Sequence, residues 1–145
     1  MIIAGKILAT LVLVAGQSVL LGLIAAGLGW RPALAGLAVG ALVIGLGSVA
    51  FSSMGLLLGG TLRAEIVLAL ANLIWFVLIG AAGLAIGVAA LPDAIHDLLV
   101  VVPSYALTSA LVTALDGGFP ALAALVLAVW TAVCGGLAVR HFSFT

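Results

Sequence analysis

Residues 32–62 are PALAGLAVGALVIGLGSVAFSSMGLLLGGTL, a run of 31 residues without a charged side chain that lies between Arg31 and Arg63. With a rise of about 1.5 Å per residue, about 20 apolar residues are enough for a helix to cross a hydrocarbon core of about 30 Å. A helix also makes its backbone hydrogen bonds within itself, which a lipid environment requires. This stretch therefore predicts a membrane-spanning helix.

Three further uncharged runs have the same property. They contain 24, 27 and 23 residues, and each is long enough to cross a bilayer. The first run could instead be a secretory signal peptide, but its apolar stretch exceeds the usual length of about 7 to 15 residues. We therefore predict an all-α membrane protein with four transmembrane helices, at about residues 7–29, 34–60, 66–90 and 119–139.

The composition of the whole chain agrees with this interpretation. Of its 145 residues, 67% are hydrophobic and 6% are charged, against about 25% charged residues in ordinary soluble domains. So few charges cannot cover the surface, which must therefore face the lipid bilayer. The positive charges form no cluster that could neutralise several phosphates, which disfavours nucleic acid as a partner. The single cysteine, Cys134, supports neither an intrachain disulfide nor a cysteine-based metal site.

A fifth apolar run, residues 98–115, is interpreted from the positions of the basic residues. With four spans, Lys6, Arg63 and Arg140 lie on one side of the membrane and Arg31 lies on the other. A fifth span would move Arg140 to the other side of the membrane, and each side would then carry two basic residues. The bias of basic residues toward the cytoplasm would be lost. The four-span topology is therefore predicted, with both termini in the cytoplasm and the protein in a cell membrane.

In this topology the segment between the third and fourth spans, residues 91–117, is external. It contains Pro92 and Pro103, and proline ends or kinks a helix because it lacks a backbone N–H group. We predict an external pair of short helices before the last span, broken at Pro103 and either re-entrant or interfacial.

Several polar and small residues lie within the predicted spans. In lipid, polar side chains bond across helices or line a polar path. The candidates for such a path are Gln17, Ser52, Ser53 and Asn72. Glycines also recur four residues apart, a spacing that lets two helices approach closely. These pairs are Gly36 and Gly40, Gly55 and Gly59, and Gly83 and Gly87. Both packing within the bundle and pairing with a second membrane subunit are compatible with this spacing.

Enzymatic activity is not expected, and no cofactor is predicted. Ser52 or Ser53 would need a histidine base, yet His96 and His141 lie outside the predicted spans. The spans contain no charged residue, which removes the usual carriers of coupled protons. The chain also has no GxxxxGK[ST] phosphate-binding loop. If the protein transports a substrate, another subunit must therefore supply the energy.

Two blocks of the sequence resemble the type 2 ABC exporter permeases. Residues 55–65, GLLLGGTLRAE, followed by residues 69–73, ALANL, resemble the segment that joins the fourth and fifth spans of that family. Residues 91–98, LPDAIHDL, followed by residues 103–105, PSY, resemble its external segment, in which two prolines lie eleven residues apart and a tyrosine closely follows the second. Gly5-Lys6 is similar to the beginning of the family's third span, so the resemblance covers essentially the whole chain in the right order.

This resemblance implies the transmembrane permease subunit of an ATP-driven exporter in a bacterial inner membrane. A separate ABC ATPase subunit would bind ATP, and a second permease copy or homologue would complete the pathway. Arg63 and Glu65 are possible coupling residues on the cytoplasmic side under this resemblance. Pro92, Pro103 and Tyr105 are possible members of an external gate.

One departure from the family concerns the number of spans. Its permeases typically carry six, whereas this chain resembles the last four, so the resemblance implies a partial permease. The alternative is a small helical membrane scaffold or assembly protein that pairs through its glycine faces and needs no ATPase. The transported substrate stays open, because a pathway without embedded charges suits lipids, amphipathic drugs and glycoconjugates alike.

Overall fold

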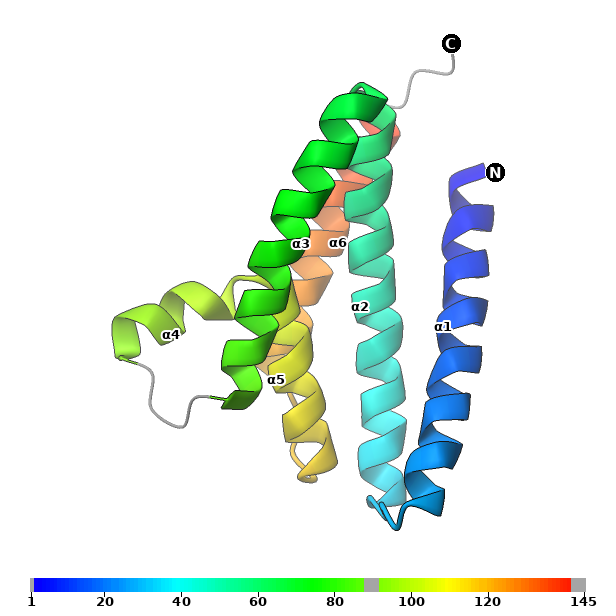
Figure 1. Cartoon of the computed structure of the whole chain (residues 1–145), viewed down its shortest axis with the longest axis vertical. Helices are drawn as coiled ribbons and strands as arrows, with labels where there is room; N and C mark the ends of the chain where they lie inside the picture. The colour runs from blue at the N-terminus through cyan, green and yellow to red at the C-terminus, as the bar shows by residue number, and fades with distance from the viewer. Residues whose placement is uncertain (1, 88–91, 142–145) are drawn as a thin grey trace.

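Six α-helices make up the part of the chain that the computed structural model describes, residues 2–87 and 92–141. The helices are α1 (Ile2–Gly27), α2 (Leu34–Thr61), α3 (Ala64–Gly87), α4 (Asp93–Val100), α5 (Pro103–Leu115) and α6 (Ala121–His141). Within these ranges there is no β-strand. The long helices α1, α2, α3 and α6 run along the bundle, and the short helices α4 and α5 lie between α3 and α6 in the chain (Figure 1).

The four long helices are the four predicted spans. Their portions that are long and apolar enough to cross a membrane are Ala4–Gly27, Leu34–Thr61, Ala64–Ile86 and Ala121–Arg140. The prediction of an all-α chain with four such helices is therefore confirmed, and the protein is a multi-pass membrane protein. The predicted end of the third span, at residue 90, lies outside the described residues.

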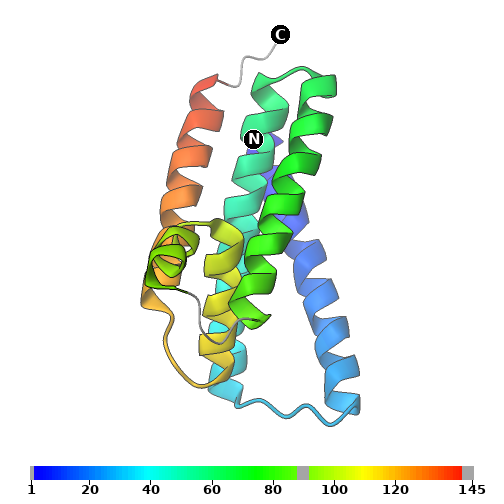
Figure 2. The same ribbon diagram turned by 60° about the vertical axis from the view of Figure 1, so that its left-hand side comes forward.

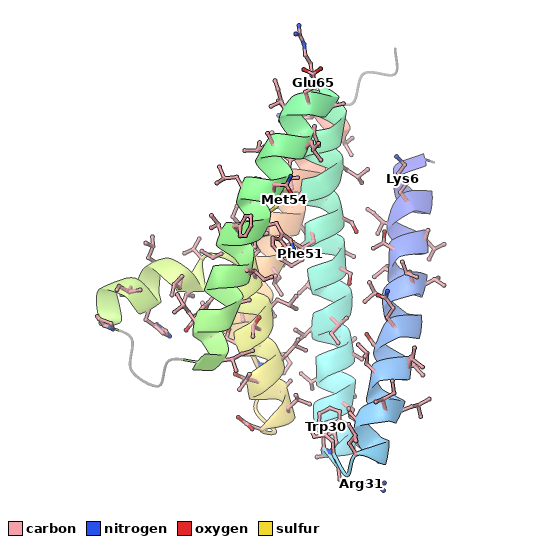
Figure 3. All side chains as sticks on the ribbon, viewed as in Figure 1. Lys6, Trp30, Arg31, Phe51, Met54 and Glu65 are labelled. Atoms are coloured by element: carbon pink, nitrogen blue, oxygen red, sulfur yellow. The ribbon has the colours of Figure 1, made fainter. Side chains whose placement is uncertain are left out.

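Charged residues mark the two ends of the bundle. Lys6 and Glu65 lie at one end, which we call the Glu65 end, and Trp30 and Arg31 lie at the other, which we call the Arg31 end (Figure 3). Helix α1 begins and α6 finishes at the Glu65 end (Figure 1), as an even number of crossings requires. The loop between α1 and α2 turns at Gly29, whose φ of 95° is a conformation that glycine adopts without steric cost.

The core lies where α2, α5 and α6 meet. Ala50, Ala106 and Leu127, one from each of these helices, are buried together there. Further apolar side chains pack around them: Leu46, Leu107, Ala123, Val126 and Trp130. Small core residues bring helix axes close together, and close contact matters because lipid gives no hydrophobic driving force between helices.

Helix α5 packs against α2, α3 and α6 (Figure 2). Its buried residues are Pro103, Ser104, Tyr105, Ala106, Ala110 and Ala114. Its 13 residues make a helix of about 20 Å, which is too short to cross a core of about 30 Å. The apolar run 98–115 is therefore not a fifth span, and it breaks at Pro103 as predicted. That the two short helices are re-entrant or interfacial stays a prediction.

Among the glycine pairs, the pair of Gly36 and Gly40 lies against another helix of the described chain. A Cβ atom on Gly36 would be 2.7 Å from the backbone oxygen of Ala114 in α5, and one on Gly40 would be 3.9 Å from Leu111. A Cβ would meet nothing within 4 Å at three glycines of the other pairs, Gly55, Gly59 and Gly83. The surroundings of Gly87 lie outside the described part. The first pair thus serves packing within the bundle, whereas Gly55, Gly59 and Gly83 face open space.

The close approach at Gly36 can be tested with a matched pair of alanine variants. Gly36→Ala forces α2 and α5 apart, because the new Cβ meets backbone that cannot rotate away, and overpacking of this kind costs about 1–3 kcal/mol. Gly55→Ala on the same helix meets no atom and gains about 0.5–1 kcal/mol from a better helix former. Unfolding of the purified protein in detergent measures both. Equal stability of the two variants would contradict the close contact between α2 and α5.

The placement of the two ends can be tested by labelling single cysteines in a Cys134→Ala background. Asp116 caps the end of α5, and that end of α5 lies at the opposite end of the bundle from Glu65 (Figures 1 and 3). In sealed vesicles, an impermeant maleimide should therefore label Asp116→Cys from one side and Glu65→Cys from the other. Labelling of both from the same side would show that the number of crossings between them is wrong.

Candidate functional site

A sharp turn joins α4 to α5 and defines the candidate site, and we call residues 101–102 the elbow. Val102 is extended (φ −75°, ψ 125°), and Pro103 is the first residue of α5. Proline suits this position because its fixed φ matches a helix and its missing N–H group needs no partner there. The Val102 N–H donates to the Leu99 oxygen at 2.9 Å, so the elbow closes onto the end of α4.

Two side-chain hydrogen bonds hold the elbow against the long helices. The Ser104 hydroxyl donates to the backbone oxygen of Leu78 in α3 at 2.7 Å. The Trp130 indole N–H donates to the oxygen of Val101 at 2.9 Å, a carbonyl that follows the end of a helix and has no partner within it. Trp130 is near the middle of α6, so the elbow lies beside the middle of a spanning helix. The two bonds therefore fix the break between α4 and α5, and they give the Val101 carbonyl a partner that it would otherwise lack.

A hollow of about 380 Å³ lies beside the elbow, between α4, α5 and the start of α6. His96 from α4 and Tyr105 from α5 meet edge to face on one side, with ring centroids 5.9 Å apart and an interplanar angle of 89°. Ser109 and Thr113 also line the hollow, and each donates its hydroxyl proton to a carbonyl of its own helix. Phe119 completes the apolar part of the wall. The hollow thus combines an apolar wall with a polar edge, a combination that suits an amphipathic group.

The structure brings together two of the three predicted gate residues. Pro103 and Tyr105 are buried at the start of α5, next to the elbow. Pro92 is exposed and precedes the first residue of α4, so the length of α4 separates it from the other two. The two prolines therefore flank α4, and the side chains that meet beside the elbow are those of Tyr105 and His96.

Arg63 and Glu65 lie where α2 turns into α3, at the Glu65 end of the bundle (Figure 3). Both side chains are exposed, and in the described structure they form no salt bridge with each other. Glu65 is in the first turn of α3, where a negative charge interacts favourably with the helix dipole. Their side chains are therefore accessible to another protein at this end.

The four predicted pathway residues occupy different environments. Gln17 on α1 and Asn72 on α3 are exposed on the outside of the bundle. Ser52 is half-buried on α2, and Ser53 is buried, with its hydroxyl oxygen 3.6 Å from the position that a Cβ atom on Gly135 of α6 would take. Ser53 thus lies at the contact of α2 with α6, whereas the two amides face away from the chain.

Three residues of the elbow region were not predicted to belong to this site: His96, Ser104 and Trp130. Ser104 had a local signal, because it directly follows the proline at which the helix starts. Trp130 had none, since it is 29 residues from its acceptor Val101. Contacts of this kind depend on how α6 folds back along α5.

Comparisons with protein-family models, with curated proteins and with solved structures found no match to this chain. Among the described residues, no group of three or more His, Cys, Asp or Glu side chains is placed to hold a metal ion. The functional interpretation therefore depends on the geometry of the bundle and of the elbow.

The hydrogen bond at the elbow can be tested by removing one hydroxyl. Ser104→Ala breaks the link between α5 and α3 and should lower the free energy of unfolding by about 0.5–1.5 kcal/mol. Ser109→Ala is the matched control, because that hydroxyl bonds only within α5, to the Ala106 oxygen at 3.1 Å. Unfolding in detergent compares the two variants. If Ser109→Ala costs as much as Ser104→Ala, the bond between the helices does not hold the elbow.

Proposed function

We propose that this protein is a transmembrane permease subunit of an ATP-driven ABC exporter in a bacterial inner membrane, with both termini in the cytoplasm. The observation that carries the proposal is the elbow: two short helices inserted between the third and fourth spans, with α5 packed against α2, α3 and α6. A scaffold of spans alone has no need of a broken helix held beside the middle of the bundle. A permease uses such an element to close its pathway on one side.

The distribution of charge supports a separate source of energy. No Asp, Glu, Lys or Arg lies in the sequence of the spans away from their ends, so the spans offer no carrier for protons. Lys6, Arg63 and Arg140 lie at helix ends on one side, against Arg31 on the other, and this excess of positive charge favours the cytoplasm for the Glu65 end. The exposed Arg63 and Glu65 then face the compartment that contains ATP, where an ABC ATPase subunit would bind.

The exposed amides support a second permease copy or a homologue as a partner. Gln17 and Asn72 lie within apolar helices and face outward. A polar group that faces lipid is unfavourable, and amide side chains in spans usually bond to another helix. A partner bundle would supply such helices, and the pathway would then run between the two bundles.

In this mechanism, ATP binding to the ATPase subunits moves the Glu65 ends of the two bundles together, and the movement reaches the elbow through α3. The Ser104 bond links α5 directly to α3, so a shift of α3 changes the position of α5. The element formed by Pro103, Tyr105 and His96 then opens or closes the far side of the pathway. The chain itself catalyses no reaction.

A small membrane scaffold without an ATPase is the second candidate. Gly55 and Gly59 on α2 favour it, because no atom lies within 4 Å of either missing Cβ. A helix of another membrane protein could pack closely against these two glycines. This alternative requires no movement at the elbow and no contact at Arg63.

Purification of the tagged full-length chain from its own cells in a mild detergent separates the two candidates. An exporter subunit should bring an ABC ATPase with it, and the ATPase activity should depend on the membrane protein. If the membranes contain this protein and an ABC ATPase but no ATPase is recovered with the protein, the scaffold proposal replaces the permease proposal.

The same preparation tests the contact at the Glu65 end. Arg63→Gln and Glu65→Gln should each weaken ATPase binding about tenfold or more, because a hydrogen bond to a charged group is worth about 1.5–3 kcal/mol. Lys6→Gln is the control, since it removes a charge at the same end from a different helix. Unchanged ATPase binding in both variants would exclude this turn from the interface.

A further inference from the structure

A long apolar groove lies on the side of the bundle away from the elbow, between α1, α2 and the last part of α5. Its volume is about 1040 Å³. Its lining residues include Ser18, Gly22, Gly40, Gly45, Leu111 and Leu115. Neither Gly22 nor Gly45 has any atom within 4 Å of its missing Cβ, so the groove is open above both glycines.

The groove is longer than one leaflet is deep. Its lining residues on α1 extend from Leu11 to Ala25, which is a length of about 21 Å along a helix. One leaflet supplies about half of a hydrocarbon core of about 30 Å. An acyl chain of that leaflet can therefore lie entirely within the groove.

The surroundings of the groove favour an acyl chain as the occupant. The spanning portion of α1 has no residue buried within the chain, so lipid reaches the groove along this helix. Apolar walls are matched by hydrocarbon, and in a bilayer the lipid supplies it.

The end of the groove carries an aromatic residue and a cation. Trp30 lines the groove, and Arg31 follows it at the same end of the bundle (Figure 3). Tryptophan prefers the level of the lipid headgroups, and the planar arginine guanidinium suits a phosphate group. Asp116, which follows α5 at this end, carries a carboxylate that repels a phosphate. Arg31 is therefore the residue that attracts one.

We propose that this groove holds one acyl chain of a glycerophospholipid from the leaflet on the Arg31 side, with the lipid phosphate at Arg31. The lipid fills the space between α1 and the α2–α5 pair and so fixes the position of α1. The proposal does not depend on an ATPase or on transport, because it concerns the occupancy of the groove alone.

Leucine substitutions test whether the lipid occupies the groove. Gly22→Leu and Gly45→Leu place side chains in it from opposite walls, and the Cβ atom at either position has no atom within 4 Å. Gly16→Leu on α1 and Gly55→Leu on α2 are the matched controls, because both glycines have open space around them and neither lines the groove. Native mass spectrometry of the purified full chain, titrated with dioleoylphosphatidylglycerol, counts the lipids bound. We expect one tightly bound lipid on the unchanged protein and on both controls, and none on Gly22→Leu or Gly45→Leu.

A second titration tests the headgroup contact. Arg31→Gln should weaken the binding of dioleoylphosphatidylglycerol about fivefold, as expected for one basic residue near an anionic lipid. The same variant should bind dioleoylglycerol, which lacks the phosphate, as well as the unchanged protein does. An equal loss for both lipids would remove Arg31 from the site and overturn the placement of the phosphate.

Two results would overturn the groove assignment. The first is equal lipid binding by the groove variants and the controls, with circular dichroism showing that all remain helical. The second is an unchanged protein that carries no lipid but forms a dimer which Gly22→Leu and Gly45→Leu dissociate, because a second copy would then fill the groove. Neither result depends on whether an ATPase is recovered with the chain.

Discussion

Hydrocarbon offers a peptide group no hydrogen-bond partner, and this constraint accounts for the long helices of the protein. Four apolar stretches satisfy the constraint by remaining helical from end to end. The helix is broken at the elbow, and there the indole N–H of Trp130 donates a hydrogen bond to the carbonyl oxygen of Val101. A break beside the middle of the bundle is therefore stable because another helix completes it.

The elbow in turn depends on close contact between backbones. Helix α5 fits among three long helices because the residues it presents are small, with Ala106, Ala110 and Ala114 fully enclosed. Gly36 lets the end of α5 approach α2 so closely that a Cβ atom at this position would be 2.7 Å from the backbone oxygen of Ala114. The Ser104 hydroxyl then fastens the other end to α3. Packing and hydrogen bonding thus place a short helix where it can respond to movement of α3.

The outer surface of the bundle is less complete than its interior. The amides of Gln17 and Asn72 face outward, and helix α1 is held mainly by α2. A permease subunit that joins a second bundle accounts for the amides, and a bound lipid accounts for the space beside α1. Both proposals follow from the same principle, because polar groups and grooves within a membrane are rarely left unfilled.

The sequence by itself determined the number of spans, their approximate bounds and the break at Pro103. Each of these follows from local properties, namely the distance between charges and the missing N–H group of proline. The tertiary structure decided which residues meet: His96 with Tyr105, Trp130 with Val101, and Gly36 with Ala114. Apolar helices are similar on all sides, so their sequences carry little information about which face turns inward. The neighbours of a side chain in such a bundle are set by the fit between helices, which no local pattern records.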